Sequence, residues 1–217
     1  MPKKRTNRRS NRRSKIRSNR RSNRRINLRS KRRSNRRTKR RSKGKSSKQI
    51  CIVSNNCYGT KYYHQNKLQY NSPFIGIFLY SECYIKLLEN FSKYMKQKPK
   101  PCSQSKYGDK KYPVMKIGDI EVHCLHDKDI QECIDKWQRR KKRMSSLNKC
   151  HIKMCDHDKY EDDFGKRFVK LRFKKKKLFL SKKNYFDDKC VVKTKYKTRC
   201  PDGYALGKYY PIEKYLL

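Results

Sequence analysis

The sequence predicts an α/β fold, with a mainly parallel sheet and flanking helices, preceded by a disordered basic tail. Three observations lead to this prediction: a repetitive Arg/Ser-rich region, short apolar runs bounded by turn residues, and segments of helical periodicity between those runs. We therefore divide the 217 residues into a disordered tail over 1–48 and an α/β domain over 49–217.

The tail over 1–48 is built from four-residue units, of which NRRS is the commonest. It contains 25 Lys and Arg and no Asp or Glu, within a chain of net charge +45. Because it has too few apolar residues to offset the entropy lost on ordering, we expect it to stay disordered.

The arginines of the tail suit a polyanion, above all a nucleic acid, because bound cations release the counterions condensed on phosphates. No aromatic residue accompanies them, so binding should be independent of sequence and sensitive to salt. Two alternatives stay open: a nuclear or nucleolar address in a eukaryotic host, and a solvated extension without a role. The arginines expected to contact the polyanion are Arg8, Arg9, Arg12, Arg13, Arg20, Arg21, Arg36 and Arg37.

The apolar content speaks against a membrane protein. The longest apolar run, over 74–80, has seven residues, whereas a membrane span needs roughly 18. No apolar stretch follows the basic N-terminus, as it would in a secretory signal. We therefore expect an intracellular, soluble protein whose ten cysteines are thiols.

The first half of the domain shows two buried strands and a helix. Apolar runs over 50–53 and 74–80, each next to turn residues, predict the strands. Apolar residues at helical spacing from Tyr84 to Met95 predict a helix that begins at the N-cap Ser81 and runs to about Lys98.

In the second half, apolar and polar residues alternate over 119–124, which predicts a strand. Asp129 and Glu132 form a capping box for a helix that ends in a basic run. Further strands are expected at 150–155, 177–181 and 190–193, and a further helix at 164–171. Strands that alternate with helices indicate a parallel sheet, whose ligands bind at the carboxyl ends of the strands.

Five segments occur in one order at domain scale: SNNCYG, YNSPFIGIFL, YIKLLENFSKYM, YPVMKIGDIEVHCLH and KWQRRKKR. Together they resemble the domain-of-unknown-function family numbered 1919, whose members look like exopolysaccharide biosynthesis proteins. The resemblance covers residues 49 to about 195 and implies an α/β fold and a role in building or modifying glycans. It assigns no cofactor and no catalytic residue, and Asp127 stands where the family pattern suggests an aromatic side chain.

The loop after the first predicted strand is the first candidate site, because a parallel sheet places binding loops there. Its residues are Asn55, Asn56 and Cys57. Asn side chains suit sugar hydroxyls, and exposed backbone amides suit a phosphate. The alternative is a structural turn with Cys57 packed beneath it.

The strand over 119–124 supplies the candidate catalytic residues. Asp119, Glu121 and His123 should share one face of this strand, and His126 follows near its carboxyl end. A carboxylate beside a histidine suits general acid–base catalysis or a divalent cation that carries phosphates. The alternative is a solvated strand edge.

The basic helix end supplies a further ligand-binding candidate. Arg140 and Arg143 lie at helical spacing from Trp137 and could bind a diphosphate or sulfate. The alternative is a core Trp137 with a solvated basic flank. We expect no metal site, because no two cysteines show the two-residue gap of a zinc knuckle.

Two functions therefore remain. The leading one is the synthesis or modification of glycans, with a nucleotide-activated sugar or an anionic glycan as ligand. The alternative is a nucleic-acid-binding protein without enzymatic activity that acts through its basic tail.

Overall fold

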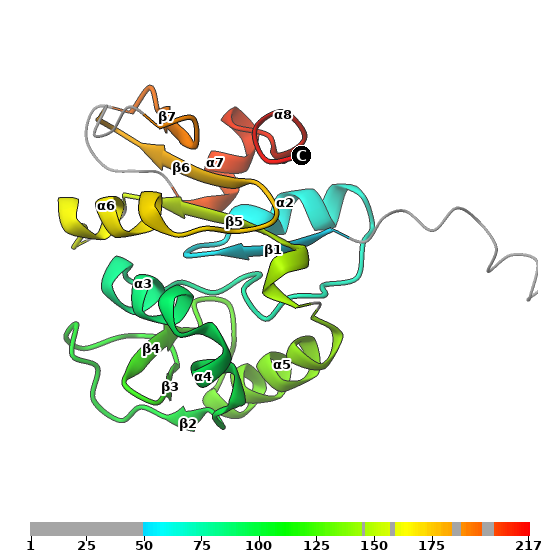
Figure 1. Cartoon of the computed structure of the whole chain (residues 1–217). Coiled ribbons are helices and arrows are strands. Elements are labelled where there is room, and N and C mark those ends of the chain that lie inside the picture. Colours follow the sequence, from blue (N-terminus) through cyan, green and yellow to red (C-terminus); the bar gives the residue numbers. More distant parts are fainter. Residues whose placement is uncertain (1–49, 145, 157–158, 184–187, 197–201) are drawn as a thin grey trace, which may run out of the picture. The chain divides into compact units, whose positions relative to one another are not determined.

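The computed structural model describes residues 50–144, 146–156, 159–183, 188–196 and 202–217. The predicted α/β class is confirmed: four parallel strands form a sheet with helices on both faces (Figure 1). The tail and its arginines lie outside the described residues, so their disorder and their polyanion binding stay predictions.

The parallel sheet has the strand order β1-β5-β6-β7. Its strands are β1 (Cys51–Ser54), β5 (Cys150–Cys155), β6 (Lys177–Ser181) and β7 (Val191–Lys193). These four correspond to apolar runs that the sequence predicted as strands. Because all the pairings are parallel, the carboxyl ends of the four strands meet at one edge of the sheet.

Alternate residues of the strands face two separate cores. Val53 and Phe179 face a core that includes residues of α3 (Ser81–Glu89) and α6 (Asp162–Lys170). Ile52 faces the other core, which is covered by three further helices: α2 (Tyr58–Gln65), α7 (Gly203–Tyr209) and α8 (Ile212–Tyr215). Figure 1 shows α6 on one face of the sheet and α2 and α7 on the other.

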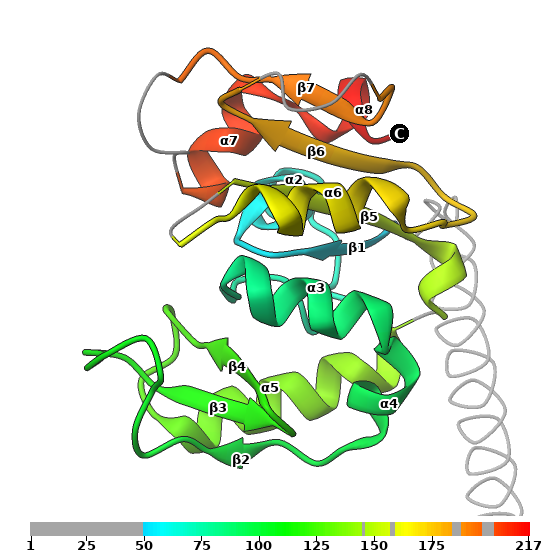
Figure 2. The ribbon, with the colours of Figure 1, turned by 60° about the vertical axis from the view of Figure 1, so that its left-hand side comes forward.

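A second, antiparallel sheet has the order β2-β3-β4. Its strands are β2 (Lys100–Pro101), β3 (Val114–Ile117) and β4 (Ile120–His123). It lies on the far side of α3 from the parallel sheet and packs against α5 (Ile130–Arg143) (Figure 2). Only β4 was predicted, because β2 has two residues and β3 lacks a clear alternation.

The second apolar run, over 74–80, was predicted to be a strand. This prediction is wrong, because the run does not form a regular strand. Phe78 alone makes an isolated bridge, with His123. The backbone N–H of Leu79 donates to the carbonyl of Asn55 at 2.9 Å, at the end of β1. Gly76 has φ +78° and breaks the extended backbone. The run is apolar because it is buried, not because it is a strand.

The helix that follows also differs from its prediction. Tyr80 occupies the N-cap position, and Ser81 is already the first helical residue, so the predicted Ser81 cap is wrong. The helix ends at Asn90, and α4 (Phe91–Lys96) follows it. The apolar spacing continues across this break because residues of both helices pack on the same core.

Four of the cysteines expected to be thiols form disulfides instead. Cys51 pairs with Cys150, directly opposite it in the register of β1 and β5, with 4.5 Å between the Cα atoms. Cys124 pairs with Cys133 and so joins the end of β4 to α5. The sequence predicted thiols because an intracellular protein was expected. It could not show that these cysteines become neighbours, because they come together only in the fold.

In the part of the chain that the structure describes, no helix is long and apolar enough to cross a membrane.

Candidate active site

Buried polar residues stand at the carboxyl ends of all four parallel strands. We call this strip the carboxyl edge and define it by Ser54, Asn55, Asn56, Asp156, Ser181 and Thr194, none of them more than 5% exposed. Burying a polar group costs free energy unless it gains partners. Ligands of parallel sheets also bind at this edge. The carboxyl edge is therefore the first place to search for a site.

The two asparagines of the edge are bonded within the protein. Asn55 extends the pairing of β1 with β5, because its Nδ2 donates to the carbonyl of Cys155 at 3.1 Å and its Oδ1 accepts from the same residue's N–H at 3.2 Å. Asn56 Oδ1 accepts from the N–H of Tyr58 at 3.2 Å. Both amides thus hold the turn in place, and their predicted contact with a ligand stays a prediction.

Lys153 lies directly beneath these asparagines and is fully buried. Its Nζ donates to Asn56 Oδ1 at 2.9 Å and to Asn55 Oδ1 at 3.4 Å. It also lies 5.2 Å from the centre of the Tyr58 ring. Among the described residues no carboxylate forms an ion pair with it. The edge therefore contains a buried cation that is held by neutral groups.

Asp156 is the one carboxylic acid of the edge. Its Oδ2 accepts from Ser181 Oγ at 2.9 Å and from the N–H of Lys182 at 2.7 Å. Its Oδ1 is buried and has no hydrogen-bond partner among the residues that the structure describes. Burial raises the pKa of this carboxyl group to about 6. An acid that titrates near neutral pH and has one unused oxygen suits proton transfer to or from a ligand.

Cys57 and His126, which are 69 residues apart in sequence, meet at the start of α2. The Sγ of Cys57 lies 3.3 Å from Nε2 of His126, and His126 is exposed. Burial, followed by the charge of Asp202, raises the pKa of the Cys57 thiol to about 11. Cys57 is therefore a thiol rather than an activated thiolate, and the imidazole is the group that a ligand can reach.

The structure brings Glu121 and His123 together, both buried on β4. Oε2 of Glu121 lies 3.8 Å from Nε2 of His123 and accepts from Ser105 Oγ at 2.7 Å. Within the described part of the chain, neither ring nitrogen of His123 has a hydrogen-bond partner. Burial lowers the pKa of this imidazole to about 4 and keeps it neutral. The rings around it belong to Phe78, Tyr80, Tyr107 and Tyr112.

Asp119 stands apart from the other predicted catalytic residues. Because β4 begins at Ile120, Asp119 lies in the preceding turn, so the prediction that it shares a strand face is wrong. It is exposed and accepts from the Tyr94 hydroxyl at 2.7 Å and from Lys86 Nζ at 3.4 Å. The Tyr94 hydrogen bond lowers the pKa of Asp119. These contacts tie the β3–β4 turn to α3 and α4.

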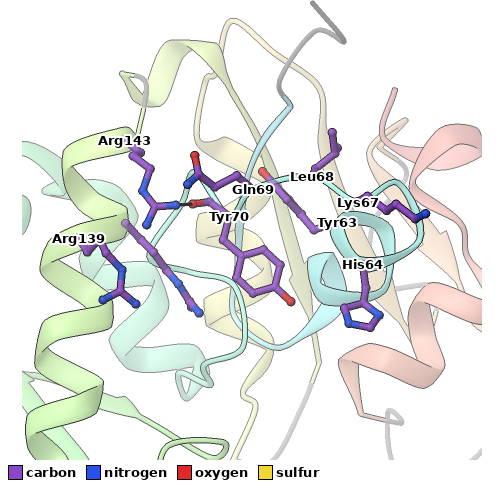
Figure 3. Close-up of a pocket in the computed structure, with 9 residues that line it drawn as sticks. Tyr63, His64, Lys67, Leu68, Gln69, Tyr70, Arg139 and Arg143 are labelled. Atoms are coloured by element: carbon purple, nitrogen blue, oxygen red, sulfur yellow. Dashed lines mark hydrogen bonds between the residues drawn. The ribbon is translucent and has the colours of Figure 1, made fainter. Parts of the chain in front are cut away.

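Arg140 and Arg143 lie away from the carboxyl edge, at the amino end of β1. The hydroxyl of Tyr63, near the end of α2, donates to the carbonyl of Ile50 just before β1, which fixes this location. The arginines border an open groove of about 580 Å³, which we call the arginine groove (Figure 3). Its lining residues are Tyr63, His64, Lys67, Leu68, Gln69, Tyr70, Arg139, Arg140 and Arg143.

One group of side chains has the composition of a metal site. Cys124, Asp127 and Cys133 offer ligand atoms within 4.8 Å of one another. The two sulfurs form a disulfide, however, and Oδ1 of Asp127 pairs with Lys136 Nζ at 2.6 Å. A metal would therefore have to compete with both of these interactions.

The sequence interpretation missed Lys153, Asp156, Ser181 and Thr194. The signal was available, because Asp156 follows the apolar run of β5 directly, just as Asn55 follows β1. Applying the same rule to each predicted strand would have found the acid at the centre of the edge.

Fold and site together define a parallel α/β protein with a buried polar carboxyl edge and a separate cationic groove. The chain belongs to the family described as "Domain of unknown function (DUF1919)", whose model matches residues 27–202. This confirms the resemblance to the numbered family and extends it at both ends, whereas the likeness to exopolysaccharide biosynthesis proteins stays a prediction.

A protein of Haemophilus influenzae described as "Uncharacterized protein" is 33% identical to this chain over 137 residues. The aligned part covers 63% of this chain and 64% of the relative. The chain thus spans less than two thirds of the length of that relative.

Proposed function

We propose that the protein is an enzyme of glycan biosynthesis or modification that acts on a nucleotide-activated sugar, with Asp156 as its general base. One observation carries this proposal: Asp156 is buried at the carboxyl edge, with Oδ2 held by Ser181 and the N–H of Lys182 and with Oδ1 unpartnered. A fixed carboxylate with one free oxygen can accept a proton from a sugar hydroxyl in a defined direction. Because Oδ1 is buried, the chain around it must open for the acceptor hydroxyl to reach it.

The step is a transfer of the sugar to an acceptor hydroxyl. The hydroxyl proton passes to Oδ1 of Asp156 while the hydroxyl oxygen bonds to the anomeric carbon of the activated sugar. The bond between that carbon and the phosphate oxygen breaks, and the nucleotide diphosphate leaves with the bonding electrons. With a pKa of about 6, Asp156 is ionised at pH 7 and is ready to take the proton.

The start of α2 is the place that we assign to the phosphates of the donor. The helix dipole favours negative charge there, while the N–H of Tyr58 already donates to Asn56 Oδ1. The exposed imidazole of His126 lies beside it, against Cys57. In this proposal the predicted candidates Cys57 and His126 act in the same site as Asp156.

A product assay with the purified full-length protein tests the proposal. Nucleotide-activated sugars are incubated with glycan acceptors, and the products are followed by mass spectrometry. We expect Asp156→Asn to lower kcat/KM about 10²- to 10⁴-fold, the usual contribution of a general base. Asp163→Asn, on the exposed side of α6, is the matched control and should leave turnover unchanged. Turnover that survives Asp156→Asn, or binding of no activated sugar or anionic glycan at all, would contradict the proposal.

Nucleic-acid binding through the tail is the second candidate. The observation that favours it is the excess of 25 Lys and Arg over 1–48 without a single acid. Deletion of 1–48 separates the two functions, because an enzyme should keep its turnover while a polyanion binder should lose most of its affinity. Unchanged affinity for nucleic acid after the deletion would exclude the tail as the binding element.

A further inference from the structure

We propose that the arginine groove binds a phosphate or sulfate group carried by a carbohydrate. The groove lies at the amino end of β1 and is therefore separate from the carboxyl edge. Its volume of about 580 Å³ falls within the range of small-molecule sites, roughly 300–1,000 Å³.

The lining of the groove is cationic and not neutralised. Lys67, Arg139, Arg140 and Arg143 border it, and no Asp or Glu is found among its described lining residues. None of these four cations forms an ion pair with a described carboxylate. Four like charges around one hollow repel each other, and a bound anion relieves that repulsion.

The guanidinium groups are held in position before any ligand arrives. Nη1 of Arg140 donates to the carbonyl of Ile75, and its guanidinium lies 4.8 Å from the centre of the Tyr70 ring. Nη1 of Arg143 donates to the carbonyl of Tyr70 at 2.9 Å. Each arginine keeps further N–H donors for a ligand. Such fixed, forked donors match the oxygens of a phosphate or sulfate.

Figure 3 shows how the side chains of the groove lie. Arg139 and Arg143 extend from α5 on one side, and His64 and Lys67 lie on the other, at the end of α2 and in the turn after it. Tyr70 lies between the two sides, and the amine of Lys67 points away from it. A tetrahedral anion beside Tyr70 would therefore meet positive charge mainly from the arginine side.

The tyrosines of the groove favour a carbohydrate over single-stranded nucleic acid. Tyr63 is fully buried, and Tyr70 already contacts both the Arg140 guanidinium and the Tyr63 ring. Neither ring offers the open platform on which single-stranded binders stack bases. The anion site follows from the groove alone, whereas the choice of a carbohydrate carrier rests on the proposed function.

Binding measurements on the full-length chain test this inference. The probes are glucose 6-phosphate, a sulfated disaccharide, the uncharged disaccharide maltose and a single-stranded oligonucleotide, each titrated by calorimetry. The test variant is Arg139→Gln with Arg143→Gln. The matched control is Lys174→Gln with Lys175→Gln, which removes the same charge from an exposed loop.

We expect the phosphorylated or sulfated sugar to bind and the double arginine variant to weaken it at least tenfold. The lysine control should stay within twofold of wild type, and maltose should not bind. Whichever of the two charged sugars binds more tightly identifies the anion. No described residue forms a hydrogen bond with the side chain of Arg139, so Arg139→Glu alone should weaken binding without unfolding the protein.

Three results would overturn the inference: no binding of either charged sugar, equal loss in the arginine variant and the lysine control, or a loss confined to the oligonucleotide. Asp156→Asn separates this inference from the proposed function, because it should lower kcat/KM about 10²- to 10⁴-fold and leave binding in the groove intact. If the charged sugar binds but the protein shows no turnover, the anion site in the groove is supported and the proposed enzymatic function is contradicted.

Discussion

The carboxyl edge and the arginine groove stand at opposite ends of β1 and are built in opposite ways. At the edge, polar side chains are buried and most of their atoms bond to each other or to the backbone. In the groove, cations face an open hollow, and no described carboxylate pairs with them. Residues of the edge therefore stabilise the fold whether or not they also bind a ligand, whereas groove residues such as Arg139 are available for a ligand alone.

This difference has an energetic consequence. Removing one partner of a buried hydrogen bond leaves the other unsatisfied, at a cost of about 1–3 kcal/mol for each group. Exposed side chains usually change stability by no more than about 0.5 kcal/mol. The two regions should therefore respond very differently to substitution. Three substitutions test this, and a fourth, at the buried His123 of β4, extends the comparison to a buried group outside both regions. They follow from the largest expected effect to the smallest.

Asn55→Ala should have the largest effect. It removes the partner of the N–H and carbonyl of Cys155 and one acceptor of Lys153. We expect the free energy of unfolding to fall by about 4 kcal/mol, since several buried groups lose a partner at once. Urea denaturation measures this, with the exposed Asn66→Ala as control. Similar losses in both variants would show that the edge is not a buried network.

His123→Phe should change the response to acid. Burial lowers the pKa of His123 from 6.5 to about 4. The unfolded chain therefore takes up a proton on this residue before the folded one does, and the wild type loses stability as pH falls from about 6.5 to 4. The loss is roughly 3 kcal/mol, at 1.36 kcal/mol per pKa unit.

The variant lacks this imidazole, and its phenyl ring fits among the aromatic rings that surround the position. Its advantage over wild type should therefore grow as the pH falls through that window, as measured by urea denaturation at several pH values. Parallel curves for wild type and His123→Phe would mean that His123 is not kept neutral by burial.

Asp156→Asn should act in the opposite sense. Burial raises the pKa of Asp156 from 3.8 to about 6. The folded protein therefore holds this proton more tightly than the unfolded chain. The resulting stability is complete below pH 3.8 and is lost as pH rises through about 6, by up to roughly 3 kcal/mol.

The amide of the variant does not ionise, so its stability relative to wild type should increase between pH 4 and 7. The same urea series detects this, with Asp163→Asn as the matched carboxylate. If the advantage instead appears as the pH falls, the environment of Asp156 favours its charged form.

Arg139→Gln in the groove should have the smallest effect on folding. Arg139 is exposed and forms no ion pair with a described carboxylate. We expect the free energy of unfolding to stay within about 0.5 kcal/mol of wild type. Differential scanning calorimetry beside Asn55→Ala gives the contrast directly. A loss that approached that of Asn55→Ala would remove the distinction between the two regions.

Much of the fold could be predicted because its signals are local. β1, β5 and β6 are apolar runs next to turn residues, and Asp129 caps α5 by accepting from the N–H of Glu132 at 2.8 Å. The run over 74–80 was wrongly predicted as a strand, because a buried irregular segment and a buried strand have the same apolar sequence pattern. The β2–β3 pairing was missed because β2 is too short to show a period.

The site was less predictable because its members meet through the fold. Cys57 and His126 are 69 residues apart, and Asn55 and Lys153 are 98 apart. The sequence indicated the loop after β1 as a candidate site. It did not show that the side chains of Asn55 and Asn56 would form hydrogen bonds within the protein. It also gave no sign that Oδ1 of Asp156 would be left without a partner.

The pKa of Asp156 measured with and without a ligand tests the central claim most directly. Selective ¹³C labelling of aspartate allows its carboxyl resonance to be followed from pH 3 to 8, with Asp156→Asn to assign it. We predict a midpoint near 6 that shifts when a nucleotide-activated sugar and its acceptor are added. A midpoint near the ordinary 3.8 that no sugar ligand moves would contradict the assignment of the carboxyl edge as the active site.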